Sequence, residues 1–351
     1  MRNTVSKEPE LRLWNGSIPI GLRIRRPARA VPKGAIFYLP GRWHNASDWK
    51  PHDPLVDIRH YLCAHGYAVA SINYRSHFLG SSAEERAFLA RSSVEDYLDD
   101  IEIALSAAGG RLGCGRMYLM GFSIGAALAF LTVGRQGSAL DRFLGVIALD
   151  GGLKKPTRSG THQLGLEWDR ATQSKAGCDS VYLSRNPAWE TETRAALGAA
   201  IASDSGMNKL RAIMPGMEGL GDDGLRHLLS QDEWWSKRMI IELESAADYD
   251  IHPTLKFDGF LGNVDCPILA LCSVEREDAR HRAIETASLT SSRSIRVERL
   301  QGWSHLQVLC GTSAIDRVHA PVLDWLRQMD ELRARCDQSS REYPRKSNAS
   351  E

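Results

Sequence analysis

The stretch Met117–Gly125 reads MYLMGFSIG and joins an apolar run to a glycine-flanked serine. The apolar run predicts a buried strand, and the small residues of 126–131, AALAFL, favour a helix directly afterwards. Ser123 therefore stands at a tight strand-to-helix turn, where glycines two residues before and after it leave room for neighbouring chain. Such a turn exposes the hydroxyl to a base and points the first helical N–H groups toward a developing negative charge. The stretch predicts Ser123 as a nucleophile.

Apolar runs and helical patterns alternate on both sides of this stretch. An Asn15-Gly16 dipeptide predicts a hairpin turn near the N-terminus. The expected strands are 11–14, 18–24, 35–39, 67–73, 117–120, 143–150, 267–272 and 294–300, and the expected helices are 55–65, 94–108, the segment after Ser123 and about 314–332. This alternation predicts an α/β fold with a mostly parallel central sheet and helices on both faces.

The alternation stops at Gly151 and resumes near Pro267. The intervening residues are polar and helix-like, which favours a helical insertion beside the sheet after the sixth expected strand. We therefore expect a core formed by residues 1–150 and 264–336 and a helical insertion over 151–263. Residues 337–351 are polar, and a disordered tail is expected there.

Composition and charge narrow the class of protein. The chain has 351 residues and a formal net charge of +1, which favours neither nucleic acid nor an anionic membrane surface as a partner. No apolar run approaches the roughly 20 residues that a membrane-spanning helix needs. The N-terminus has no apolar signal, and the seven cysteines are scattered without C-x-x-C pairs, so a cytoplasmic protein with reduced thiols is expected. The histidines form no metal-ligand pattern with Cys, Asp or Glu, and we expect neither metal nor cofactor.

A serine hydroxyl needs a base that removes its proton, and His305 is the strongest candidate. It lies in Gly302–Leu306, GWSHL, directly after the last expected strand. Parallel strands bring their carboxyl ends to one edge of a sheet, so this loop can reach the turn at Ser123.

The histidine in turn needs a carboxylate that fixes its tautomer and stabilises its charged form. The loop after the 267–272 strand offers Glu275, Glu277 and Asp278. We favour Asp278 and then Glu277. Asp150 is a rival, because it ends the preceding strand on the same side of the sheet.

Acyl transfer also needs N–H donors for the oxyanion. One is the backbone N–H of Ile124, at the start of the helix. The second is expected from the loop that follows the 35–39 strand, where Gly41 permits close approach and the N–H of Arg42 or Trp43 points inward.

Large apolar side chains are candidates for an apolar substrate pocket, although those in the insertion could equally form its own core. The candidates are Trp43, Phe122, Trp189, Trp234 and Trp235, with Met207, Met214 and Met217.

Together these motifs resemble the α/β-hydrolase superfamily. Leu39-Pro40-Gly41 is similar to the family's His-Gly oxyanion motif, with proline in place of histidine, and Tyr67–Arg75 is similar to its strand that ends in an Asp-Tyr-Arg phrase. Trp303–Leu306 resembles its histidine loop, and the order of serine, acid and histidine is the family's order. The insertion after Asp150 falls where the family places its cap.

The resemblance implies a serine hydrolase that acts on a small, apolar acyl compound, a carboxylic ester, lactone or thioester, through an acyl-enzyme on Ser123. Two alternatives remain open. An acyltransferase would use the same acyl-enzyme with an alcohol or amine, and a binding protein would keep the fold without catalysis.

Overall fold

A computed structural model describes the protein over residues 5–28, 30–41, 45–46, 51, 53–135, 142–153, 198–200, 202–213, 219–229, 238–239, 242–243, 257–274 and 282–342. Within these residues, nine strands form one sheet in the order β1-β3-β5-β4-β6-β7-β8-β9, and β2 pairs with β3. The strands are β1 Val5–Lys7, β2 Leu11–Asn15, β3 Ile18–Pro27, β4 Gly34–Leu39, β5 Tyr67–Asn73, β6 Met117–Phe122, β7 Phe143–Leu149, β8 Ile268–Val274 and β9 Ile295–Gln301.

From β5 to β9 every neighbouring pair of strands is parallel, whereas β1, β2 and β3 join the sheet in antiparallel fashion. The predicted fold class is therefore confirmed. The parallel strands place their carboxyl ends at one edge, and the residues that follow β6, β7 and β9 meet there. The strand predicted as the sixth corresponds to β7 in the structure. The numbers differ by one because an unexpected strand, β1, precedes the predicted hairpin.

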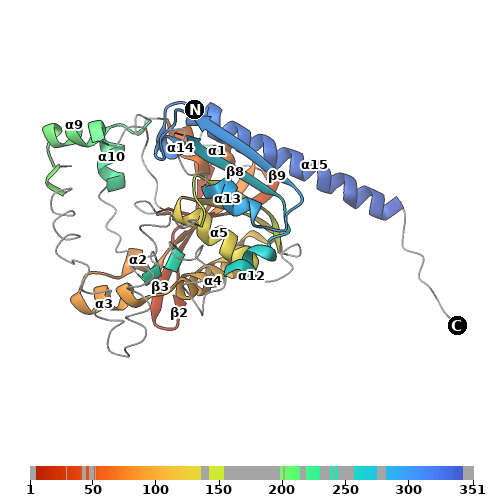
Figure 1. Cartoon of the computed structure of the whole chain (residues 1–351), viewed down its shortest axis with the longest axis horizontal. Helices are drawn as coiled ribbons and strands as arrows, with labels where there is room; N and C mark the ends of the chain where they lie inside the picture. The colour runs from red at the N-terminus through yellow and green to blue at the C-terminus, as the bar shows by residue number, and fades with distance from the viewer. Residues whose placement is uncertain are drawn as a thin grey trace.

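Helices cover both faces of the sheet (Figure 1). Alternate residues of β4 show this directly, since Phe37 and Leu39 belong to one buried cluster while Ile36 and Tyr38 belong to the other. The first cluster takes residues from α4 Val94–Leu112, α5 Ile124–Arg135, α12 Phe257–Gly262 and α13 Arg282–Ser288. The second takes residues from α1 Ile58–Ala64, α9 Asp204–Ile213, α10 Asp222–Leu229, α14 Gln307–Cys310 and α15 Ala320–Glu342.

Several elements have other boundaries than the sequence predicted. Two short helices, α2 Arg75–Phe78 and α3 Ala83–Arg91, connect β5 to α4 and were not expected. Ser82 caps the N-terminus of α3 and Ser93 caps that of α4, each through a capping box that satisfies free N–H groups at the start of its helix.

The last helix begins later and ends later than predicted. A π-helical turn, Ile315–His319, precedes α15, which continues to Glu342. The tail expected from 337 is therefore helical up to 342, and residues 343–351 lie outside the described range. Trp325 and Leu326 anchor the first half of α15 in the core, and extending an anchored helix costs far less than nucleating one.

The described elements between β7 and β8 are all helical. Met207 of α9 and Leu225 of α10 are buried in the cluster on one face of the sheet. Met239, Leu243 and Leu261 are buried in the cluster on the other face. The segment between β7 and β8 therefore has anchor points on both faces of the sheet.

Candidate active site

Ser123 occupies the strained turn that the sequence predicts. β6 ends at Phe122, α5 begins at Ile124, and the φ angle of Ser123 is +56°. This left-handed conformation is unfavourable for a residue with a side chain, so the surroundings must hold it. The Ser123 N–H donates to the carbonyl oxygen of Leu149 at 3.0 Å, and its own carbonyl accepts from Ala126 at 3.0 Å.

The loop after β4 packs directly against this turn. A Cβ on Gly125 would lie 2.1 Å from the carbonyl oxygen of Leu39, and a Cβ on Gly41 would lie 3.0 Å from the Cβ of Ser123. Both positions thus require glycine because two backbones approach closely. The Tyr74 hydroxyl donates to the carbonyl oxygen of Pro40 at 3.2 Å and ties the same loop to β5.

His305 lies in the loop after β9, as predicted. The Gly302 N–H donates to Val274 at 2.8 Å, and the Ser304 N–H donates to the Gln307 side chain at 2.7 Å. The imidazole stacks on the ring of Phe122, with centroids 4.7 Å apart and planes inclined by 22°. Because Phe122 directly precedes Ser123, this stacking brings His305 to the same edge of the sheet as the serine.

Among the described residues, the carboxylate that contacts His305 belongs to Asp150. The distance between His305 Nδ1 and Asp150 Oδ2 is 2.7 Å. An acceptor at this position favours the tautomer with its proton on Nδ1, which leaves Nε2 able to accept a proton. The Asp150 side chain is only 10% exposed while that of His305 is 46% exposed, so the pair has a buried acidic end and an accessible imidazole.

Asp150 is itself firmly held. Its φ angle is +48°, and its N–H donates to the carbonyl oxygen of Leu271 at 2.8 Å. Ser273 donates to it twice: the backbone N–H to Oδ1 at 2.7 Å, and the hydroxyl to Oδ2 at 2.5 Å. Ser273 is not among the site residues predicted from the sequence. The available signal was a hydroxyl at the carboxyl end of the strand next to β7.

Many of the predicted site residues lie outside the part of the chain that the structure describes. These are Asp278, Glu277 and Glu275 among the acids, Arg42 and Trp43 in the oxyanion loop, and Trp189, Trp234, Trp235, Met214 and Met217 among the pocket candidates. Of the rest, Ile124 is the first residue of α5, so its N–H has no intrahelical acceptor. Phe122 is buried beneath His305, and Met207 is buried in the core.

Metal-ligand clusters and membrane-spanning helices are considered next, within the described residues only. No cluster of three or more His, Cys, Asp or Glu side chains could hold a metal ion there. Among the helices in the same ranges, none combines the length and the apolar character needed to cross a membrane.

A serine in a strained strand-to-helix turn, beside an imidazole–carboxylate pair at the carboxyl edge of a parallel sheet, defines the class of α/β hydrolases. The comparison with protein families agrees: the model of the alpha/beta hydrolase family matches residues 36–281, and the chain belongs to this family. Among proteins with curated functions, no significant match was found.

Solved structures with the same fold cover nearly the whole chain. A candidate lipase from Sulfolobus solfataricus has a TM-score of 0.63 and 18% identity, over 93% of this chain and 95% of that chain. A thioesterase domain from the curacin biosynthetic pathway has a TM-score of 0.56 and 17% identity, over 91% and 99%. A thermophilic esterase from Thermogutta terrifontis has a TM-score of 0.53 and 15% identity, over 92% and 100%. At these identities the likeness concerns the fold.

Proposed function

We propose that this protein is a serine hydrolase that cleaves a carboxylic ester, lactone or thioester through an acyl-enzyme on Ser123. The observation that carries the proposal is the hydrogen bond between His305 and Asp150 next to a serine with a φ angle of +56°. Membership of the alpha/beta hydrolase family supports hydrolase chemistry in general.

In this mechanism the Ser123 hydroxyl attacks the acyl carbon while Nε2 of His305 takes its proton. The imidazolium then protonates the leaving alcohol or thiol, and the same nitrogen later activates the water that releases the acid. Asp150 holds the Nδ1 proton and stabilises the positive charge, and the 2.7 Å contact between the two groups supports this role over Asp278, Glu277 or Glu275. These assignments make Ser123, His305 and Asp150 the proposed catalytic residues.

The oxyanion in this proposal accepts from the Ile124 N–H and from an N–H of Arg42 or Trp43. The close approach of Gly41 to Ser123 supports this placement, because the loop that follows it starts within contact of the nucleophile. We also propose that residues 151–263 form a cap that limits the size of the acyl pocket. The helices in the chain segment between β7 and β8, which pack on both faces of the sheet, support such a cap.

Labelling with a fluorophosphonate tests the proposal. The wild-type protein should be labelled on Ser123, and Ser123→Ala should lose both labelling and turnover of p-nitrophenyl esters while its fold is unchanged by circular dichroism. Ser288→Ala, at an exposed serine of α13, is the matched control and should keep both. Unchanged turnover by Ser123→Ala would remove the proposal. Product analysis with added alcohols or amines distinguishes hydrolysis from acyl transfer.

A further inference from the structure

Among the described residues, the Asp150 carboxylate has two hydrogen-bond partners at the carboxyl edge of the sheet, and only one of them, His305, belongs to the proposed mechanism. The other is Ser273, at the end of β8. We propose that Ser273 is a positioning residue: it fixes the Asp150 carboxylate and shares Oδ2 with His305, and so sets how strongly that carboxylate stabilises the imidazolium. This inference rests on the proposed function.

The geometry determines the orientation of the whole carboxylate. The Ser273 N–H binds Oδ1 at 2.7 Å and the Ser273 hydroxyl binds Oδ2 at 2.5 Å, so one residue holds both oxygens. Rotation of the carboxylate about its Cβ–Cγ bond would break both contacts. The Oδ2 atom is thereby kept 2.7 Å from His305 Nδ1.

Sheet register explains why this residue is available. β7 and β8 are parallel neighbours with Leu149 opposite Leu271, and the Asp150 N–H bonds the Leu271 carbonyl. Ser273 lies two residues beyond Leu271, so its side chain emerges on the same face of the sheet as the side chain of Leu271. Asp150, with its φ angle of +48°, turns its carboxylate across to this neighbouring strand.

The shared oxygen has an electrostatic consequence. A donor on Oδ2 offsets part of the carboxylate's negative charge, and that part is no longer available to the imidazolium. Among the described residues, the Cys272 thiol also has an electrostatic interaction with Asp150, and it interacts with Arg299 of β9 as well. Burial, followed by the charge of Asp150, raises the pKa of Cys272 to about 11. The thiol is therefore neutral at neutral pH and adds no negative charge beside the Asp150 carboxylate.

The test compares Ser273→Ala with Ser273→Thr, which keeps a hydroxyl. The matched control is Ser71→Ala, because Ser71 is buried in β5 and its hydroxyl has no hydrogen-bond partner among the described residues. Thermal unfolding checks that each variant folds. In Ser273→Ala the plateau of kcat/KM should fall by about tenfold to a hundredfold, because a carboxylate held only through Oδ1 by the backbone N–H of residue 273 is less well fixed and misplaces the base.

The pH profile separates positioning from a merely structural role. In Ser273→Ala the acidic limb of kcat/KM should move to higher pH by about half a unit, since the carboxylate stabilises the imidazolium more strongly when the competing donor is gone. In Ser273→Thr the acidic limb of kcat/KM should lie close to its wild-type pH. In Ser71→Ala it should lie at the wild-type pH. An acidic limb that stays in place or moves to lower pH in Ser273→Ala would overturn the inference.

A measurement that needs no catalysis distinguishes this inference from the proposed function. In protein labelled with 15N-histidine, the Nδ1 resonance of His305 is assigned by its absence from His305→Gln. It should shift in Ser273→Ala, return with Ser273→Thr and stay unchanged in Ser71→Ala. If fluorophosphonate fails to label Ser123 while this pattern holds, the proposed function fails and the positioning contact stands. If the Nδ1 resonance of His305 does not shift in Ser273→Ala, the inferred influence of the Ser273–Asp150 hydrogen bond on His305 is refuted.

Discussion

At the scale of single residues, the site depends on two backbone positions that are unfavourable for residues with side chains. Ser123 and Asp150 both have positive φ angles, and they are joined through the hydrogen bond from the Ser123 N–H to Leu149. Each such residue costs on the order of 1–3 kcal/mol, which the surrounding packing must offset. The proposed mechanism gives a reason for strain at these two positions, because it requires Ser123 and Asp150 to face the same histidine.

The choice of acid can be tested by replacing the candidate carboxylates one at a time. Asp150→Asn should lower kcat by about 10³- to 10⁴-fold, because an amide no longer fixes the histidine tautomer or stabilises its charge. Asp278→Asn, the matched control at the acid that the sequence favoured, should stay within a few-fold of wild type. Steady-state kinetics on a p-nitrophenyl ester measures both, and the opposite ranking would assign the acid to Asp278.

At the scale of elements, buried charges hold the connections around the sheet. Arg75 of α2 forms a bidentate pair with Asp100 of α4, with Nε–Oδ2 and Nη2–Oδ1 distances of 2.7 and 2.9 Å. The side chains are 2% and 0% exposed, and Asn15 also donates to Asp100. The Asn73-Tyr74-Arg75 phrase, which resembles a family motif, therefore ties the end of β5 to the helix that precedes β6.

Breaking this pair should destabilise the fold more than breaking a pair at the surface. Arg75→Met leaves the Asp100 carboxylate buried without its cation, so the free energy of unfolding should fall by about 3–5 kcal/mol. Arg296→Met removes the partly exposed pair with Asp324 and should cost about 1 kcal/mol or less. Urea unfolding followed by circular dichroism measures both changes. Equal losses for the two variants would contradict the prediction.

A buried histidine in the π-helical turn before α15 should make stability depend on pH. Burial lowers the pKa of His319 to about 4 from its ordinary value of 6.5. Its Nδ1 lies 3.2 Å from the carbonyl oxygen of Leu55, and Nε2 has no partner among the described residues. Between pH 6.5 and 4 the unfolded chain binds this proton and the folded chain does not, so stability falls as the pH falls.

The size of this effect follows from the shift. A difference of roughly two pKa units is worth about 3 kcal/mol, lost progressively from pH 6.5 down to 4. His319→Gln keeps a polar group of similar size but does not titrate. The drop in unfolding free energy between pH 7 and pH 5 should therefore be smaller in this variant than in wild type. Identical drops in the two proteins would exclude His319 as the source.

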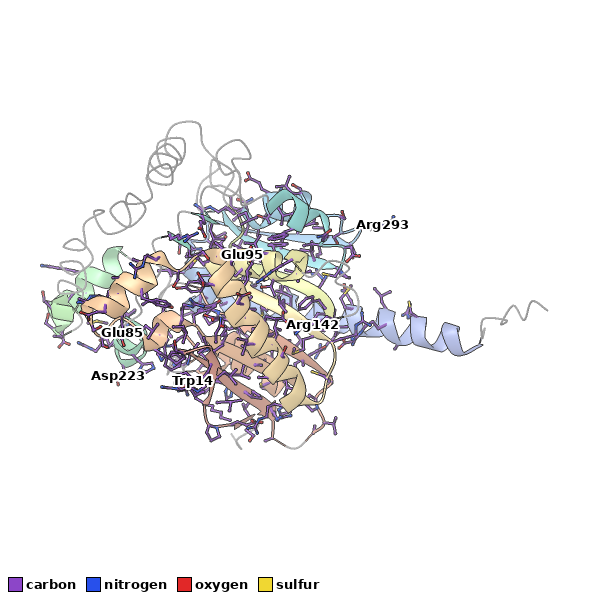
Figure 2. The ribbon with its side chains drawn as sticks, turned by 90° about the horizontal axis from the view of Figure 1, so that it is seen from below. Trp14, Glu85, Glu95, Arg142, Asp223 and Arg293 are labelled. Atoms are coloured by element: carbon purple, nitrogen blue, oxygen red, sulfur yellow. The ribbon has the colours of Figure 1, made fainter. Side chains whose placement is uncertain are left out.

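At the scale of the whole molecule, the α15 side chains that join the described hydrophobic core all lie in the first half of the helix. Trp325 is buried against Tyr118, with ring centroids 5.8 Å apart, and Asp330 accepts hydrogen bonds from the hydroxyls of Tyr67 and Tyr118. Beyond this point Leu332 and Cys336 are exposed, and the helix projects from the body of the molecule in both views (Figures 1 and 2).

The two halves of the helix should therefore respond differently to change. Trp325→Ala should lower the free energy of unfolding by about 3–5 kcal/mol, because a large buried ring is lost between the sheet and the helix. A chain ending at Cys336 should unfold within about 0.5 kcal/mol of wild type, because Leu332 and Cys336, just before the cut, are already exposed and exposed positions contribute little. Thermal and urea unfolding give both values. A large loss on truncation would mean that the projecting half has a partner.

Apolar patterning and one turn were enough to predict the α/β fold and the places of Ser123 and His305 in it, because strand and helix periods and the need for glycine at a tight turn are local properties of a chain. Local properties of the chain do not decide among Asp278, Glu277, Glu275 and Asp150. All four follow strands that end at the same edge, and only the three-dimensional packing brings one carboxylate to the imidazole. The sequence therefore determined the kind of sheet and the edge of it at which Ser123 and His305 lie. The tertiary structure alone decided that Asp150 meets both His305 and Ser273, since hydrogen bonds between neighbouring strands depend on register and on the φ angle of a single residue.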